Sequence, residues 1–310
     1  MKFAFVFPGQ GSQAVGMLNG FGDNPVVKDT LAEASEAIKV DLAKLIAEGP
    51  KEELDLTTNT QPVMLAAAVA TWRAWLAAGG AMPALVAGHS LGEYSALVAA
   101  GAIRFADAVP LVRFRAQAMQ EAVPVGQGGM AAILGLSDED VRAACAEAAQ
   151  GEVVEPVNFN APAQVVIAGH KGAVERACDA AKARGAKRAL LLPVSAPFHS
   201  SLLQPASIRL RDYMAGLTFA VPALPLINNV DVAILNDPES IKDALVRQAA
   251  SPVRWVETVN KFAVEGITHV IECGPGKVLS GLTKRINGDL TGDAIVDQGS
   301  LERIVELVKQ

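Results

Sequence analysis

The stretch Ala84–Tyr94, ALVAGHSLGEY, decides the fold of this chain. A short apolar run ends in a Gly-x-Ser-x-Gly pattern, and the Ala/Leu-rich run that follows has the composition of a helix and stops at Gly101. The predicted order is strand, sharp turn, helix. In such a nucleophile elbow the serine backbone is strained, and the flanking glycines let strand and helix pack closely while the hydroxyl stays exposed. The pattern therefore predicts that Ser90 is a nucleophile, the alternative being a plain Gly/Ser turn.

Length and composition limit what the rest of the chain can be. It has 310 residues, of which 51% are hydrophobic and 19% charged, enough for one large domain or two modest ones with a sizeable core. The formal net charge is −6, and no cluster of Lys and Arg is interleaved with aromatic residues. Binding to nucleic acid is therefore not expected.

The cysteine spacing and the length of the apolar runs indicate which cofactors, cellular compartment and membrane association to expect. The cysteines are odd in number, far apart and without CxxC spacing: Cys145, Cys178 and Cys273. They predict neither a disulfide framework nor a zinc site, so we expect no metal, no cofactor and a reducing, cytoplasmic compartment. The apolar run Phe3–Phe7 is too short for a signal peptide, and the run Pro62–Trp72 is stopped by Arg73. No association with a membrane is expected.

The N-terminal stretch predicts a buried strand, Lys2–Phe7, followed by the glycine-rich loop Pro8–Gln13. Its Gly-x-Gly-x-x-Ala pattern imitates a dinucleotide-binding fingerprint, but the acidic second strand that such a site needs is missing. The run Val26–Ile46 is instead helical in period, and Pro62–Ala78 predicts a long apolar helix with Pro62 in its first turn. We favour a loop that offers a bare backbone N–H to a ligand.

A second informative helix is expected at Asp107–Val123. At 100° per residue its apolar side chains share one half of the circumference, and Arg115 falls in the middle of that half, whereas Arg113 lies on the polar side. A buried guanidinium must find a carboxylate or several acceptors, because an unpaired charge is costly in the interior. Two readings stay open: a structural ion pair or snorkelling side chain, and a fork that awaits an anionic ligand.

The segment 125–196 predicts a separate small unit that begins at the linker Val125–Gly129. Strands and helices are expected there in the order β-α-β-β-α-β, at Met130–Leu136, Ser137–Ala149, Val153–Asn158, Gln164–Ala168, Lys171–Arg184 and Lys187–Val194. This order is the ferredoxin-like plan. We therefore expect 125–196 to be a ferredoxin-like subdomain inserted into a larger domain formed by 1–124 and 197–310.

The larger domain is expected to be α/β-hydrolase-like, with a parallel sheet and the elbow. Its remaining strands are predicted at Pro225–Val230, Thr268–Cys273 and Ala294–Asp297, and its remaining helices at Glu239–Ala250, Arg254–Glu265, Lys277–Ile286 and Leu301–Val308.

Of the four histidines, His199 is the candidate for a catalytic base. It lies on a proline-containing loop after the last strand of the inserted unit, where it could reach across a cleft. His89 neighbours Ser90 and should point away from its hydroxyl, while His170 follows a strand and His269 lies within one. A lone histidine is more often structural, but a candidate nucleophile upstream favours the base.

Five motifs occur in order: Pro8–Gln13 (PGQGSQ), Gly88–Glu93 (GHSLGE), Arg115 before Met119 and Gln120, Pro197–His199 (PFH) and Glu272–Gly276 (ECGPG). On these motifs the chain resembles, nearly end to end, the malonyl-CoA:acyl carrier protein transacylases of fatty acid synthesis. The resemblance implies a ping-pong transfer in which malonyl passes from coenzyme A to Ser90 and then to the phosphopantetheine thiol of acyl carrier protein.

The resemblance also implies roles for individual residues. His199 would deprotonate Ser90 and protonate the departing thiol, oriented by the backbone carbonyl of Gln248 rather than by an Asp. The backbone N–H groups of Gln10 and Leu91 would form the oxyanion hole.

Two further residues would act on the acyl group. Arg115 would bind the malonyl carboxylate bidentately. A bulky ring at Phe198 would crowd a 2-methyl branch and so favour malonyl.

Acyl carrier protein, as an acidic partner, would need a local basic patch. The candidates are Lys182, Arg184, Lys187 and Arg188 in the inserted unit, and Lys277, Lys284 and Arg285 in the larger one.

Alternatives from other classes stay open. A serine thioesterase or esterase would use the same elbow but release the acyl group to water. The chain could also be a malonyl-transfer subunit of a malonate decarboxylase complex, or an acyl-binding module without catalysis.

Overall fold

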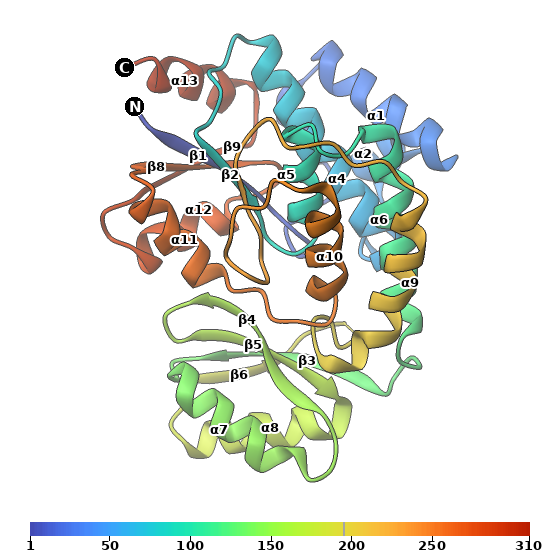
Figure 1. Cartoon of the computed structure of the whole chain (residues 1–310), viewed down its shortest axis with the longest axis vertical. Helices are drawn as coiled ribbons and strands as arrows, with labels where there is room; N and C mark the ends of the chain where they lie inside the picture. The colour runs from blue at the N-terminus through green and yellow to red at the C-terminus, as the bar shows by residue number, and fades with distance from the viewer. Residues whose placement is uncertain (195) are drawn as a thin grey trace.

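The computed structural model describes residues 1–194 and 196–310, and two sheets organise them (Figure 1). The first sheet is parallel, with the strand order β7-β2-β1-β8-β9, and the second is antiparallel, with the order β4-β5-β3-β6. The predicted α/β class with a parallel sheet is confirmed. The parallel strands are β1 (Phe3–Phe7), β2 (Leu85–Gly88), β7 (Leu226–Ile227), β8 (His269–Cys273) and β9 (Thr291–Ile295).

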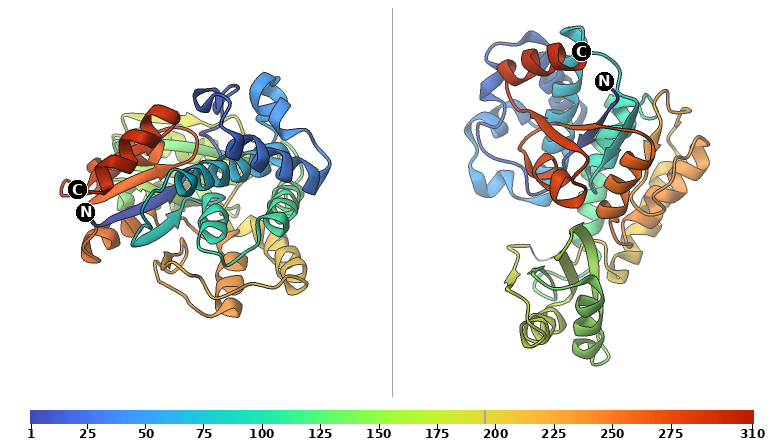
Figure 2. Two further views of the ribbon diagram at one scale, coloured as in Figure 1. Left: turned by 90° about the horizontal axis from the view of Figure 1, so that it is seen from above. Right: turned by 90° about the vertical axis from the view of Figure 1, so that its left-hand side faces the viewer.

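Strand β1 lies at the centre of the parallel sheet and is buried along its whole length. Phe3, Phe5 and Phe7 belong to the core that α4 and α6 cover, whereas Ala4 and Val6 belong to a second core under α11 and α12. Figure 2 shows helices on both sides of this sheet. An unbroken apolar run is what a strand buried on both faces requires.

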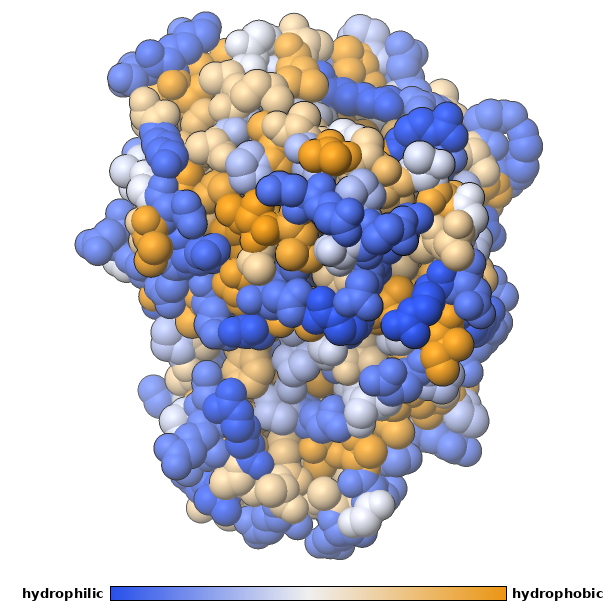
Figure 3. Space-filling view, in the orientation of Figure 1, coloured by the Kyte–Doolittle hydropathy of each residue, from blue (hydrophilic) through white to orange (hydrophobic). Residues whose placement is uncertain are grey.

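The helices around the parallel sheet are α1 (Pro25–Ile38), α2 (Leu42–Glu48), α3 (Lys51–Leu54), α4 (Thr57–Ala77), α5 (Gly92–Ala99), α6 (Phe105–Glu121), α9 (Gln204–Ala215), α10 (Pro238–Gln248), α11 (Trp255–Val264), α12 (Val278–Ile286) and α13 (Gln298–Val308), with short 3₁₀ turns at Asn19–Phe21 and Ser201–Leu203. None of the helices in the described part of the chain is both long and apolar enough to cross a membrane. Figure 3 shows hydrophilic side chains spread over one face, with hydrophobic ones in smaller groups between them.

Two predictions near the N-terminus are wrong. The expected helix Val26–Ile46 is two helices, because Lys39 adopts a left-handed conformation with φ of 55° that ends α1. Helix α4 begins at Thr57, so Pro62 lies in its second turn rather than its first. Its first five residues are polar, and Thr57, Thr60 and Gln61 among them are buried, which is why the apolar pattern began only at Pro62. Thr57 donates a hydrogen bond to Gln10 in the loop after β1.

Helix α9 is an element that the sequence pattern did not predict. Its buried face consists of Ala206, Leu210 and Met214, spaced four residues apart, together with Ser207. It packs against α6 and α10. The helix follows directly on the 3₁₀ turn Ser201–Leu203, which begins two residues after His199.

The antiparallel sheet forms the lower part of Figure 1 with two helices on its outer face. Its elements are β3 (Gly128–Leu134), α7 (Asp138–Ala149), β4 (Val154–Ala161), β5 (Gln164–His170), α8 (Lys171–Ala183) and β6 (Arg188–Leu191). Ser137 caps α7, accepting a hydrogen bond from the backbone N–H of Asp140. The element order β-α-β-β-α-β is the predicted one.

The other face of the antiparallel sheet looks toward the parallel sheet. Met130 and Val166 from this face line the cavity described below. Strand β4 also pairs through its backbone with Val253, whose N–H donates to the carbonyl of Val157 at 2.8 Å and whose carbonyl accepts from Phe159 at 3.1 Å. This bridge joins the two parts of the molecule beside the cavity.

Candidate active site

The elbow has the geometry that its sequence predicts. Ser90 sits between β2 and α5 with φ of 53°, a left-handed conformation that is strained for a serine. A Cβ atom on Gly88 would lie 1.9 Å from the backbone of Gly92, and one on Gly92 would lie 2.0 Å from the carbonyl oxygen of Phe7. Only glycine at these two positions allows strand, turn and helix to approach so closely.

Asn229, just beyond β7, clamps the elbow from the neighbouring strand. Its Oδ1 accepts a hydrogen bond from the backbone N–H of Ser90 at 2.8 Å, and its Nδ2 donates to the carbonyl of Gly88 at 2.6 Å. The side chain is fully buried. The strained serine backbone is thus held by bonds from both ends of one amide.

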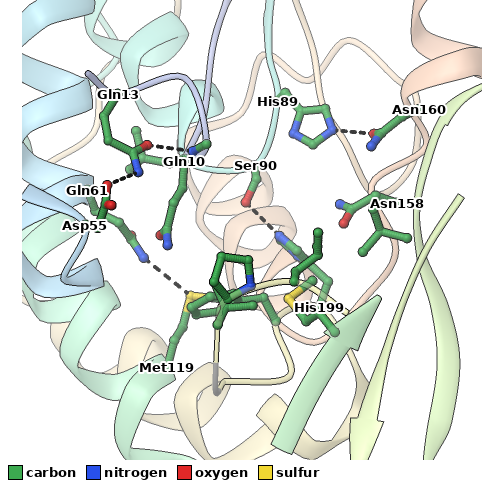
Figure 4. Close-up of a pocket in the computed structure, with 18 of the residues that line it drawn as sticks. Gln10, Gln13, Asp55, Gln61, His89, Ser90, Met119, Asn158, Asn160 and His199 are labelled. Carbon is green, nitrogen blue, oxygen red and sulfur yellow. Dashed lines mark hydrogen bonds between the residues drawn. The ribbon is translucent and has the colours of Figure 1, made fainter. Parts of the chain in front are cut away.

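His199 meets the serine from the other side of the cavity (Figure 4). Its Nε2 lies 2.6 Å from Ser90 Oγ and its Nδ1 lies 2.8 Å from the carbonyl oxygen of Gln248. Because a carbonyl can only accept, Nδ1 carries the proton and Nε2 is left to accept from the serine hydroxyl. Burial, with a further contribution from the charge of Arg115, lowers the pKa of His199 to about 3, so the ring is neutral near pH 7.

Arg115 lies on the buried face of α6, with a relative exposure of 1%. Its guanidinium donates to three neutral acceptors: Gln61 Oε1 at 2.8 Å, Gln248 Oε1 at 2.9 Å and Ser90 Oγ at 3.3 Å. Its Nε, also buried, has no acceptor among the described residues. Burial lowers the pKa of this guanidinium. The described residues therefore surround the charge with amides and a hydroxyl rather than with a direct ion pair, and Nε is left without an acceptor.

Gln10 and Leu91 meet at the floor of the same cavity. The loop after β1 runs against the elbow so closely that a Cβ on Gly9 would lie 2.5 Å from the carbonyl oxygen of His89. None of the hydrogen bonds among the described residues uses the backbone N–H of Gln10 or Leu91. The side chain of Gln10 accepts from Thr57 Oγ1 at 2.7 Å, which anchors this loop to the start of α4.

The cavity has a volume of about 510 Å³ and lies between the two sheets. Ser90, His199 and Arg115 line it together with Phe198, whose half-buried ring also contacts both adjoining cores. Leu192–Val194, which follow β6, form part of the opposite wall. A volume of this size accommodates a small acyl group and the end of its carrier.

The other histidines lie apart from the serine hydroxyl or point away from it. His89 makes a 2.8 Å hydrogen bond to Asn160 and packs edge-on against Trp255, away from the hydroxyl as predicted (Figure 4). His170 accepts from the backbone N–H of Val153, and His269 begins β8. The structure thus brings His199 alone of the four to Ser90.

Three polar residues at this site were not predicted: Gln61, Glu93 and Asn229. Gln61 is 2% exposed and holds Arg115, and Glu93 is 2% exposed directly beneath the elbow. The signal for Glu93 was present, since a carboxylate within an otherwise buried apolar helix needs partners. Gln61 was hidden because it precedes the apolar run that marked the helix.

The candidate basic residues for a carrier protein lie at the surface. Arg184 forms ion pairs with Asp140 and Glu147, whereas Lys187 and Arg188 stand exposed at the start of β6. Arg285 donates to Gln164 from the other part of the molecule. Lys182, Lys277 and Lys284 are also exposed.

Comparisons with known proteins identify the family of this chain. The family model described as "Acyl transferase domain" matches residues 4–287. The malonyl CoA-acyl carrier protein transacylase of Salmonella typhimurium is 58% identical over 97% of each chain. Among solved structures, an acyl-carrier-protein S-malonyltransferase from Burkholderia pseudomallei is 69% identical with a TM-score of 0.97, covering 99% of this chain and 100% of its own.

A second solved structure holds a malonyl-transacylase in complex with a type II PKS acyl-carrier protein. This transacylase is 54% identical with a TM-score of 0.98, and the match covers 99% of this chain and 100% of that one. The resemblance seen in the five sequence motifs is confirmed along the whole chain. The chain belongs to the malonyl CoA-acyl carrier protein transacylases, within the acyl transferase family.

Proposed function

We propose that this chain transfers malonyl from malonyl-CoA to the phosphopantetheine thiol of acyl carrier protein through a malonyl ester on Ser90. One observation carries the proposal: Ser90 Oγ lies 2.6 Å from a neutral imidazole nitrogen and 3.3 Å from a buried guanidinium with an unused donor. A base and a group that can bind a carboxylate thus both lie within hydrogen-bond distance of the nucleophile.

In the first half-reaction the Ser90 hydroxyl attacks the thioester carbonyl while His199 Nε2 accepts its proton. The negative charge on the carbonyl oxygen is stabilised by the backbone N–H groups of Gln10 and Leu91, whose lack of an internal acceptor supports this role. The C–S bond then breaks, and the proton passes from His199 to the coenzyme A sulfur. This step leaves malonyl-Ser90 and a free thiol.

The second half-reaction runs the same steps in reverse with a different thiol. His199 removes the proton of the phosphopantetheine thiol, the sulfur attacks the ester, and the proton returns to Ser90 as the C–O bond breaks. The carbonyl of Gln248 keeps Nδ1 protonated throughout, so that Nε2 exchanges the proton in both directions. No acidic third residue is needed for this cycle.

Selection of the acyl group is assigned to Arg115 and Phe198. The carboxylate of malonyl would take two N–H groups of the guanidinium, including the Nε that has no partner. The ring of Phe198, next to His199, would crowd a 2-methyl branch. Substrates without a carboxylate would leave the buried charge unpaired.

The finer description of the fold also belongs to this proposal. We assign residues 1–124 and 197–310 to an α/β-hydrolase-like catalytic domain and 125–196 to an inserted ferredoxin-like subdomain. The nucleophile elbow at the end of β2 supports the first assignment. The strand order β4-β5-β3-β6, with both helices on one face, supports the second.

We assign the docking of acyl carrier protein to Lys187 and Arg188. These exposed cations precede Leu192–Val194, which line the cavity, so a partner held there would lie near its mouth. Replacing both with Glu should raise the KM for acyl carrier protein while leaving transfer to free pantetheine unchanged. Unchanged KM values for both acceptors would refute the assignment.

Mass spectrometry of the protein mixed with malonyl-CoA tests the proposed function. A malonyl group should add to Ser90, persist without an acceptor, and disappear when holo acyl carrier protein is added. The Ser90→Ala variant should gain no mass. Prompt loss of the ester to water would favour a thioesterase, and unchanged transfer by Ser90→Ala would exclude the covalent intermediate.

A further inference from the structure

Glu93 is a buried carboxylate that none of the proposed reaction steps uses. It follows the elbow in the first turn of α5 and is 2% exposed. Its Oε2 accepts two hydrogen bonds, from Gln248 Nε2 at 2.9 Å and from the backbone N–H of Asn229 at 3.2 Å. Such a group is costly to bury, so its partners deserve a functional explanation.

The contact with Gln248 joins Glu93 to Arg115. The amide of Gln248 lies between them: Oε1 accepts from Arg115 Nη2 at 2.9 Å, and Nε2 donates to Glu93 at 2.9 Å, the shortest of its contacts, as well as to the carbonyl of Ser90 at 3.0 Å and to Asn229 Oδ1 at 3.3 Å. We propose that Glu93 is a positioning residue for the proposed malonyl transfer: it fixes the amide of Gln248 and thereby the guanidinium of Arg115.

The chemistry of the three groups gives the amide one direction. A carboxylate oxygen accepts and a guanidinium only donates, so the NH₂ end of Gln248 must face Glu93 and the carbonyl end must face Arg115. A reversed amide would set N–H against N–H at Arg115. Burial raises the pKa of Glu93 to about 7, yet Oε2 can stay an acceptor in the protonated form, with the proton on Oε1.

This arrangement also keeps Arg115 available. A direct ion pair would occupy the fork, whereas an intervening amide takes one N–H of Nη2 and leaves Nε without an acceptor among the described residues. The guanidinium is thus held in place by an amide, and its buried Nε keeps an N–H that a substrate carboxylate could take. Glu93 itself need never touch the substrate.

The contact that orients His199 is separate from this chain of side chains. His199 bonds to the main-chain carbonyl of Gln248, at the last residue of α10, and the helix fixes that carbonyl whatever the side chain does. Loss of the Glu93 contact should therefore impair recognition of the malonyl carboxylate more than it impairs acyl transfer as such.

The test compares kcat/KM for malonyl-CoA and for acetyl-CoA in the full-length protein, with pantetheine as acceptor. Glu93→Leu removes the acceptor at similar volume and should lower the malonyl-to-acetyl ratio about tenfold, the effect of one lost hydrogen bond to a charged group. Glu93→Gln keeps an acceptor oxygen and should hold the ratio within about threefold. An unchanged ratio in Glu93→Leu, or an equal fall in Glu93→Leu and Glu93→Gln, would overturn the proposal.

A matched control is Glu272→Leu. Glu272 is also fully buried with a pKa raised by burial to about 7, but it accepts from Ser280 at the start of α12, away from this network. Its replacement should lower the thermal midpoint without moving the ratio. A ratio that falls as much as in Glu93→Leu would assign the effect to general destabilisation and refute the specific role.

A second variant, Gln248→Met, covers the case in which Glu93→Leu does not fold. Gln248→Met removes the amide but keeps the carbonyl that His199 uses, and it should lower the ratio as Glu93→Leu does; an unchanged ratio overturns the proposal. Where both single variants fold, adding Glu93→Leu to Gln248→Met should cause no further fall, and additive effects would also overturn it. If the wild-type protein shows no malonyl preference, the proposed function itself fails.

Discussion

Replacing Arg115 with Ala tests the assignment of acyl selectivity most directly. The guanidinium already bonds to Gln61 and Gln248, and the donors left for a substrate carboxylate include Nε and the N–H that points at Ser90 Oγ. Two hydrogen bonds to a charged group are worth about 1.5 kcal/mol each at the lower end of the usual range, or about 3 kcal/mol together. At 1.4 kcal/mol per factor of ten, the malonyl-to-acetyl ratio of kcat/KM should fall roughly a hundredfold.

The assay follows acyl-Ser90 formation from each thioester by rapid quench and mass spectrometry. Arg113→Ala is the matched control, because Arg113 lies two residues away on α6 and makes only a 3.4 Å contact to the carbonyl of Ile38. Its removal should leave the ratio unchanged. If the malonyl-to-acetyl ratio is unchanged in Arg115→Ala, or falls equally in Arg115→Ala and Arg113→Ala, the malonyl carboxylate is bound elsewhere.

Three further predictions concern the base and the elbow. His199→Ala should slow both half-reactions by a factor of about 10² to 10⁴, measured separately by acylation and by transfer to pantetheine; a change confined to the KM for carrier protein would contradict it. With its pKa lowered to about 3, His199 stays neutral in acid, so Ser90 acylation should fall less than threefold from pH 7 to 5, where a histidine of pKa about 6.5 would lose more than tenfold. In the unfolded chain the His199 ring binds a proton below about pH 6.5, whereas in the folded chain it stays neutral down to about pH 3. His199 therefore makes the free energy of unfolding decrease as the pH falls from about 6.5 toward 3. Gly92→Ala should cost more than about 2 kcal/mol in urea unfolding because its Cβ would lie 2.0 Å from the carbonyl oxygen of Phe7, whereas Gly281→Ala, with open space around it, should be near neutral.

The elbow could be predicted from sequence because its geometry demands particular residues. A Cβ atom on Gly88 would lie 1.9 Å from the backbone of Gly92, and one on Gly92 would lie 2.0 Å from the carbonyl oxygen of Phe7. Both positions therefore require glycine, and these glycines can be recognised in the sequence. The inward position of Arg115 was likewise visible from helical spacing. In both cases the prediction depends only on residues that are close in the chain: the backbone geometry of the elbow in the first case and the helical period in the second.

The partners of these residues could not be predicted in the same way. Arg115 bonds to residues 54 and 133 positions away, and nothing in its own helix distinguishes an amide from a carboxylate. Backbone groups such as the carbonyl of Gln248 carry no side-chain signature, so family resemblance alone indicated them. Helix α9 was missed although Ala206, Leu210 and Met214 share one face, because the exposed apolar residue Ile208 lies outside that face and blurs the helical pattern.

The backbone bridge between β4 and Val253 has a mechanical consequence. The chain crosses between the two parts of the molecule at the ends of the segment 125–196, and a body tied at two points can rotate about the line through them. The bridge, together with the hydrogen bond from His89 to Asn160, adds ties beside the cavity that restrain that rotation. We therefore expect the chamber around Ser90 to keep its width while one thioester leaves and another enters, without closure of one part of the molecule on the other.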